Sequence, residues 1–147
     1  MDPVYLDDIS AGLELVSAQR IVSAADMAAF ADLTSDHNPL HADPSAVADG
    51  SPYEAPIAHG LLVTSISSGQ PTAADGWALG IYLEASRRFV APVYAGDAIR
   101  TVSTVTEVRR SRSKPDRGVV TMTVRVLNQR AEVVQEGIDV VLVGARP

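Results

Sequence analysis

The chain of 147 residues carries 12 basic and 18 acidic side chains, so that its net charge at pH 7 is −6, and it contains no cysteine. With 46% hydrophobic and 20% charged residues it is typical of a globular protein, and we expect one domain over residues 1–147. These figures exclude disulfides and cysteine-based metal or thiolate sites, disfavour nucleic acid, whose phosphates need a basic surface, and leave no apolar run near the roughly 20 residues of a membrane span.

The first half of the chain predicts mainly helix and ordered loop. Its acidic N-terminus lacks the apolar core of a signal peptide, so we expect a soluble, cytoplasmic protein. A short strand is expected over residues 13–22, and Ser23, with an acid three positions later, resembles the cap of a helix over residues 24–33. Pro44 is placed to begin a second short helix. An apolar stretch over residues 59–68 predicts a third helix that is buried.

The second half predicts strands joined by short turns. Apolar or alternating runs occupy residues 81–90, 99–108, 119–127 and 133–143, and a turn is expected at residues 128–130. Strands joined by short turns are antiparallel. The fold class is therefore α+β, with about five antiparallel strands that bury one helix.

The densest group of polar side chains lies between residues 35 and 43. Pro39 keeps the backbone there irregular, so that Asp36 and His41 can converge. A carboxylate and an imidazole that share one water molecule form a general acid–base pair, which can add that water to a polarised double bond or remove it. Asn38 would fix the orientation of either partner. The alternative is a solvated surface turn in which Asp36 caps the chain and Asn38 makes an Asx turn.

A helix N-terminus at Gly60 is the second candidate feature. Backbone N–H groups at such an end have no partner within the helix, and they suit an oxygen that gains negative charge during a reaction. The alternative is a glycine that only lets the helix pack closely under the sheet. His59, taken alone, fits a structural histidine held by backbone groups.

Other common sites do not fit the spacing. His37 and His41 lie four positions apart, as helical zinc ligands do, but Pro39 prevents a helix between them, so we expect no metal. The chain also has no Gly-x-Ser-x-Gly elbow and no glycine loop of the phosphate- or dinucleotide-binding kind.

Cationic side chains gather in two places. Residues 109–117, at an expected turn between strands, hold five of the 12 basic residues. Such a run is either a solvated loop tip or a landing site for the phosphates of a carrier molecule or for an acidic carrier protein. Arg87 and Arg88 are neighbours in a predicted strand, so one of them faces the apolar side. An inward arginine needs a carboxylate of the protein or an anionic ligand.

Three stretches of the chain together resemble the MaoC-like (R)-specific enoyl-CoA hydratase/dehydratase family. They agree with the family in order and spacing, and the resemblance extends from about residue 13 to the final strand. The stretches are Phe30–His41, Pro56–Leu62 and Phe89–Val93, the last followed by Gly96–Asp97.

The resemblance implies a hotdog fold, in which a curled antiparallel sheet wraps around a long central helix. Such domains usually pair through their sheets, with the active sites near the interface. A homodimer or a dimer of dimers is therefore expected. The need to cover sheet edges agrees with this expectation.

By the same resemblance, the chain would be a lyase that adds water to a trans-2-enoyl thioester, giving the (R)-3-hydroxyacyl thioester, or removes it. Its substrate would be an acyl-CoA or an acyl carrier protein thioester. Asp36 and His41 would hold the catalytic water, and the Gly60 N–H would receive the charge that builds on the thioester oxygen. Asn38 would support the pair, and Ser68 would line the acyl pocket or assist the site. Coenzyme A or phosphopantetheine is part of the substrate, so no cofactor is implied.

The chain departs from the family pattern at two places. Residues 70–74 are polar or small where relatives often continue with larger apolar residues, and Arg87 stands where an apolar residue is common. Both departures predict an acyl group that is shorter, smaller or more polar than a medium-length fatty chain. We expect His59, Arg87 and Arg88 to contact substrate or carrier, the arginines through carrier phosphates or a substrate carboxylate.

Two other functions stay open. A hotdog thioesterase would direct the water at the carbonyl carbon and release a free thiol. A non-catalytic hotdog subunit would bind an acyl thioester or complete a heterodimer, but it would have no chemical need for Asp36, Asn38 and His41.

Overall fold

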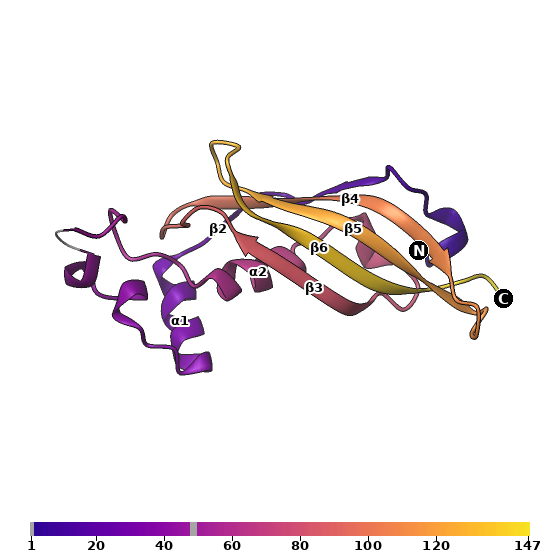
Figure 1. Cartoon of the computed structure of the whole chain (residues 1–147), viewed down its shortest axis with the longest axis horizontal. Coiled ribbons are helices and arrows are strands. Elements are labelled where there is room, and N and C mark those ends of the chain that lie inside the picture. The colour runs from indigo at the N-terminus through magenta and orange to yellow at the C-terminus, as the bar shows by residue number, and fades with distance from the viewer. Residues whose placement is uncertain (1, 48–49) are drawn as a thin grey trace.

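The computed structural model describes residues 2–47 and 50–147 (Figure 1). Its 3-10 helices are η1 (Leu6–Asp8), η2 (Pro39–His41), η3 (Pro44–Val47) and η4 (Ala73–Gly76), and its α-helices are α1 (Ala24–Thr34) and α2 (Gly60–Gly69). Its strands are β1 (Glu14–Val16), β2 (Arg20–Ile21), β3 (Ile81–Phe89), β4 (Ala98–Arg110), β5 (Arg117–Leu127) and β6 (Val133–Gly144).

The strands form one antiparallel sheet. Their order is β1-β4-β5-β6-β3, and β2 pairs with β4 beyond β1. The predicted α+β class and the four predicted long strands are confirmed. Because β3 is the last strand of this order, it pairs with β6 on one side and is an edge strand on the other.

The prediction of one strand over residues 13–22 is wrong, because the chain leaves the sheet between β1 and β2. At the break, the Ser17 hydroxyl accepts the Thr101 N–H at 2.9 Å and donates to the Ala18 carbonyl at 2.9 Å. A side chain thus takes a hydrogen bond that a continuous ladder would give to the backbone. The regular alternation expected in β4 is also interrupted, by a register shift between Val105 and Glu107.

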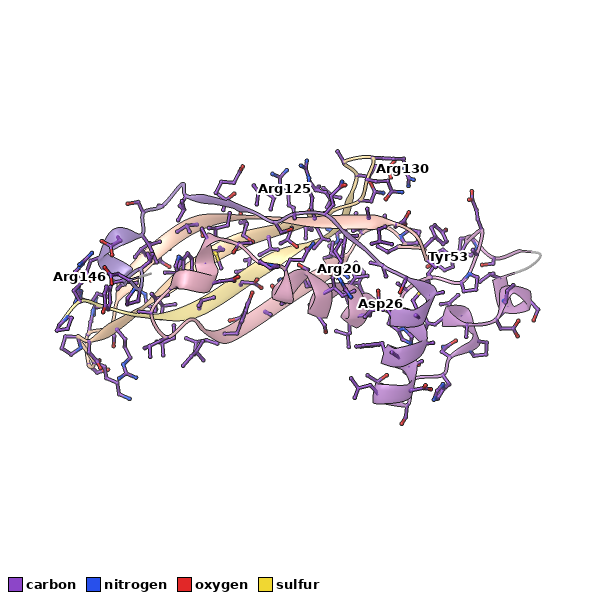
Figure 2. The ribbon with its side chains drawn as sticks, turned by 180° about the vertical axis from the view of Figure 1, so that it is seen from behind. Arg20, Asp26, Tyr53, Arg125, Arg130 and Arg146 are labelled. Carbon is purple, nitrogen blue, oxygen red and sulfur yellow. The ribbon has the colours of Figure 1, made fainter. Side chains whose placement is uncertain are left out.

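Helix α1 begins as the sequence predicts. The Ser23 hydroxyl accepts the Asp26 N–H at 3.0 Å, and the Asp26 carboxylate accepts the Ser23 N–H at 2.9 Å, which is a capping box. Arg20 lies beside Asp26, with 3.1 Å between guanidinium and carboxylate (Figure 2). The short helix predicted to begin at Pro44 is the 3-10 helix η3.

Helix α2 packs on one face of the sheet, and its apolar side chains belong to one of the hydrophobic core clusters. Leu62 and Val63 are buried there together with Ile99, Val126 and Val134. The helix spans 10 residues, so it is shorter than the long central helix that the hotdog resemblance implies. It is also not buried on all sides within one chain, because Leu61 is 63% exposed. Helix α1 and the segment up to α2 project beyond the end of the sheet (Figure 1).

Strands β3 and β6 approach each other closely at Gly137 of β6. A Cβ atom at Gly137 would lie 1.9 Å from the Ser86 carbonyl oxygen and 3.1 Å from the Arg87 Cα, both backbone atoms. We expect Gly137→Ala to lower the free energy of unfolding by about 1–3 kcal/mol, because the two strands must separate. Urea unfolding at one fixed protein concentration measures this. Gly69→Ala is the control, since none of the described residues beyond its chain neighbours and its own helix places an atom within 4 Å of its Cβ position, and a loss as large in Gly69→Ala would contradict the interpretation.

Candidate active site

The segment after α1 is held in an irregular shape by its own polar side chains. Ser35 adopts a left-handed conformation, with φ of 60°, and ends the helix. The Asp36 carboxylate then accepts the Asn38 N–H at 3.3 Å, and the Asn38 side chain accepts the Leu40 N–H at 3.0 Å at the start of η2. Pro39 is the first residue of η2. The Asx turn that the sequence offers as an alternative is therefore present, and it bends the chain so that His41 turns back toward α2.

Two histidine rings meet at the centre of this region. The rings of His41 and His59 stack with 3.7 Å between centroids and 25° between planes. His41 Nδ1 lies 2.7 Å from the Ile57 carbonyl oxygen, and His59 Nε2 lies 3.0 Å from the Asp36 carbonyl oxygen. A carbonyl oxygen only accepts, so each of these nitrogens is the one that carries a proton. His41 Nε2 is then left with a free lone pair, as a general base requires.

The Asp36 carboxylate completes the group. One of its oxygens lies 3.9 Å from His59 Nε2, and the side chain is 53% exposed. One ligand-type atom from each of Asp36, His41 and His59 lies within 4.8 Å of the others. The prediction that Asp36 and His41 converge therefore agrees with the geometry, and the arrangement suits proton transfer to or from a water at its exposed side.

Carboxylates and imidazoles are also zinc ligands. Zinc binds histidine nitrogens at about 2.0–2.1 Å, with the lone pairs directed at one ion. Stacked, nearly parallel rings do not direct their lone pairs at one point, and one nitrogen of each ring already faces a carbonyl oxygen. The geometry opposes a metal here, and the expectation that none is used stays a prediction.

Helix α2 begins beside the two histidines. Its first residue, Gly60, follows His59, which gives no side-chain cap, so the first N–H groups of the helix are not capped by that residue. A Cβ atom at Gly60 would lie 2.7 Å from the Phe89 ring, so a larger residue here would require that ring to move. The Gly60 carbonyl accepts Gln135 Nε2 at 2.7 Å, which ties the helix start to β6.

A cavity of about 390 Å³ borders this helix start. Its lining includes His41, Gly60, Tyr53 and Phe89. Tyr53 belongs to the projecting segment (Figure 2). A base and a helix N-terminus thus border one hollow. This combination suits a substrate whose oxygen accepts an N–H while a water is activated nearby.

The remaining predicted site residues lie elsewhere or are already occupied. His59 is expected to contact the substrate, but its side chain is 3% exposed between His41 and Phe30, so it faces the protein interior. Among the described residues its Nδ1 has no hydrogen-bond partner. Ser68 borders a different cavity and donates to the Thr64 carbonyl at 2.9 Å.

Arg87 is the inward arginine, and a carboxylate of the protein is its partner. Its guanidinium donates to both oxygens of Asp139, at 2.6 and 3.0 Å, and the two side chains are 3% and 4% exposed. This pair takes the place of the anionic ligand that the sequence also allows. Arg88 points outward, is 82% exposed and lies 3.9 Å from Glu136. The basic run forms the turn between β4 and β5, at the end of the sheet away from α1 (Figure 1), so within one chain it is not part of this site.

Three residues of this region are not found by sequence reasoning. Gln135, which is 2% exposed, holds the Gly60 carbonyl, Phe89 closes the space beside Gly60, and Asp139 pairs with Arg87. For Gln135 and Asp139, the signal that could have found them was a polar residue at an inward position of the last strand. Which partner they meet depends on the register between β6 and β3 and on the position of α2.

In sequence the chain is similar to proteins of one known family. The family model "MaoC like domain" matches residues 11–128. The (R)-specific enoyl-CoA hydratase of Aeromonas caviae is 40% identical over 109 residues, which are 72% of this chain and 75% of that protein.

Solved structures agree with this match. The MaoC-like dehydratase of Rhodospirillum rubrum superposes with a TM-score of 0.81 at 32% identity and covers 98% of this chain and 99% of its own. A Mycobacterium tuberculosis protein described as having a double hotdog fold gives a TM-score of 0.79 at 21% identity, over 99% of this chain and 45% of that one. The predicted hotdog fold is therefore confirmed. No helix among the described residues is both long and apolar enough to cross a membrane.

The buried ion pair generates a stability prediction. Removing one partner of such a pair leaves the other charge uncompensated and costs about 3–5 kcal/mol. We expect Arg87→Met to lower the free energy of unfolding by that amount in urea unfolding at fixed protein concentration. Arg88→Met, the neighbouring control, removes an 82% exposed guanidinium and should change it by less than about 0.5 kcal/mol. Similar small losses in both variants would contradict the role given to the pair.

Proposed function

The chain belongs to the MaoC-like domain family, and we propose that it adds water to a trans-2-enoyl thioester to give the (R)-3-hydroxyacyl thioester, or catalyses the reverse. A hydratase among its relatives and a dehydratase among the solved structures support this reaction class. The single observation that carries the proposal is the meeting of the Asp36 carboxylate and the His41 imidazole beside the N-terminus of α2.

In the proposed hydration, a water molecule lies between Asp36 and His41. Its oxygen attacks C3 of the enoyl group while the unprotonated His41 Nε2 takes one of its protons. The electron pair of the 2,3-double bond moves toward the thioester carbonyl, so that negative charge builds on that oxygen. A proton returned by the Asp36–His41 pair to C2 completes the addition, and dehydration runs through the same steps in reverse.

Gly60 is proposed to stabilise the developing charge through its backbone N–H. The N-terminus of α2 has the positive end of the helix dipole and an uncapped N–H group. Removing one such donor from an oxyanion site typically costs about 10²–10³-fold in turnover. Asn38 supports this geometry by holding the turn between Asp36 and Leu40.

We further propose that His59 positions the other two residues. It donates to the Asp36 carbonyl at 3.0 Å and stacks on His41 at 3.7 Å, and it is buried, so it acts on the site without touching the substrate. Coenzyme A or the phosphopantetheine arm of a carrier protein would enter as part of the substrate, with no separate cofactor. Action in the cytoplasm and a single domain over residues 1–147 stay predictions.

A homodimer or a dimer of dimers is proposed on the strength of the edge strand β3. Almost all of its residues are exposed in the single chain. Among them Ile81, Leu83 and Phe89 are 50%, 55% and 55% exposed. A long apolar edge strand is a template for pairing with another strand. A second copy of the chain would cover it.

The catalytic assignment predicts a large loss of turnover with an intact fold. Asp36→Asn and His41→Ala should each lower kcat for hydration of trans-2-butenoyl-CoA by about 10²–10⁴-fold, because each removes one half of the acid–base pair. Loss of enoyl absorbance without release of free thiol measures hydration and separates it from thioester hydrolysis. Asp32→Asn is the control, since this carboxylate is 80% exposed and faces His37. Near-normal rates in both folded variants would refute the assignment.

The assembly is tested on β3. Leu83→Lys places a charge on the exposed edge strand and should shift the protein to a smaller species, because an edge lysine opposes strand pairing. Size-exclusion chromatography with light scattering gives the mass of each species. Leu33→Lys, on α1 at an 83% exposed position, should leave the mass unchanged. A wild-type protein that is monomeric at high concentration would reject this interface.

A further inference from the structure

A second cavity, of about 290 Å³, lies between the C-terminal half of α2, the sheet and the segment that follows α2. Its lining combines apolar side chains, among them Leu15, Trp77 and Met122, with a large set of polar ones. The polar set comes from four elements and consists mainly of Ser67, Ser68, Tyr82, Thr101, Ser103 and Asp139. A cavity of this composition is unusual for the binding of a plain alkyl chain, because alkyl groups would cover polar groups without replacing their hydrogen bonds.

Hydrogen bonds to Asp139 hold polar side chains in place on one side of the cavity. The Asp139 carboxylate receives two hydrogen bonds from Arg87 and a third from the Tyr82 hydroxyl at 3.3 Å. Burial raises the pKa of the Tyr82 phenol, and the charge of Asp139 raises it further. The phenol therefore stays protonated at neutral pH and keeps donating to Asp139. Its oxygen retains lone pairs that can accept a hydrogen bond from a ligand.

Two further hydroxyls differ in how they are used. Thr101 is engaged, since its hydroxyl lies 2.7 Å from the Gln70 side-chain oxygen and 2.9 Å from the Ser67 hydroxyl. Ser103 is 8% exposed and lines the cavity, and within residues 2–47 and 50–147 its hydroxyl makes no hydrogen bond. This hydroxyl is therefore available to a ligand oxygen in the cavity, to which it can donate.

The cavity lies along the same helix as the proposed reaction site. Gly60 and Val63 border the first hollow, and Ser67 borders the second. Seven residues of α-helix span about 10 Å, and they return Ser67 to nearly the same face as Gly60. Strand β3 runs between the same two places, from Tyr82 to Phe89. The two cavities are thus separated by about 10 Å along α2, a length that an extended acyl chain held by its thioester at Gly60 would span.

The charge of the lining restricts what that far end can be. Arg87 is neutralised by Asp139, and a second carboxylate, Asp75, also lines the cavity. A substrate carboxylate would therefore meet net negative charge. A neutral hydroxyl would donate to the Tyr82 oxygen and accept from the Ser103 hydroxyl, and a carbonyl oxygen would accept from Ser103, in both cases without that repulsion.

From these contacts we propose that the second cavity selects an acyl thioester whose chain carries a neutral hydroxyl or carbonyl oxygen near its far end, in preference to a plain alkyl chain. This inference rests on the proposed hydration of enoyl thioesters and names the class of acyl group. Tyr82 and Ser103 are the residues that recognise the oxygen, and the Arg87–Asp139 pair holds Tyr82 in place.

The experiment compares two series of trans-2-enoyl-CoA thioesters of matched length, with and without a terminal hydroxyl. The lengths run from roughly six to ten carbons, because two turns of helix separate the two cavities. The wild-type protein should show a kcat/KM that is about tenfold higher for the hydroxylated member at the best length, since two hydrogen bonds are gained. In the double variant Tyr82→Phe/Ser103→Ala this ratio should fall toward one.

Ser65→Ala is the matched control. It removes a hydroxyl from the exposed side of α2, where it donates to the Leu61 carbonyl at 2.7 Å, and it should keep the wild-type ratio. Hydration of trans-2-butenoyl-CoA by the wild-type protein tests the proposed function separately. If that substrate is hydrated but the alkyl series is preferred at every length, or the double variant keeps the wild-type ratio, the inference is overturned and the function stands. If no enoyl thioester is hydrated, both fall.

Discussion

The candidate site depends on two contacts between imidazole rings and backbone carbonyl groups. His41 faces the Ile57 carbonyl at 2.7 Å, and His59 faces the Asp36 carbonyl at 3.0 Å. Each contact joins the segment after α1 to the residues just before α2, and the two rings stack between them. The segment projects beyond the sheet (Figure 1), and none of residues 35–46 is buried. Together with the Ile57 N–H, which donates to the Leu40 carbonyl at 3.1 Å, these contacts orient the carboxylate and the imidazole.

Helix α2 organises the chemistry because its two ends have different surroundings. At its first residue, a glycine lies against the Phe89 ring and its carbonyl is held by Gln135, so the position of the helix end is fixed. Toward its last turn, the helix faces hydroxyls and a buried ion pair. One short helix thus offers a positive dipole end for an oxygen that gains charge and, further along, a polar space for another part of the same molecule.

Much of the fold could be predicted from the sequence because its signals are local. The Ser23 cap, the interruption by Pro39, the start of α2 and the four long strands each follow from a few neighbouring residues. The convergence of Asp36 and His41 was predictable for the same reason, since a proline between them prevents a helix.

The features that escaped prediction depend on residues far apart in the chain. Ser17 interrupts the first strand because it meets Thr101, and Gln135 reaches Gly60 only after β6 has paired and α2 has packed. One of Arg87 and Arg88 could be recognised as inward, but the choice of Arg87 and of its partner 52 positions away could not be made from the sequence. Pairing register and packing decide such contacts, and neither follows from composition or spacing alone.

The buried pair between β3 and β6 also constrains how this chain can change over evolutionary time. Replacement of either Arg87 or Asp139 alone strands a charge in the interior, whereas replacement of both by aliphatic side chains of similar volume is often neutral or stabilising. A lineage can therefore leave this state only through a costly intermediate or by two nearly simultaneous substitutions. Because Asp139 also accepts the Tyr82 hydroxyl, such a paired exchange would remove that hydrogen bond as well, so that the polarity of the neighbouring cavity would change at the same step.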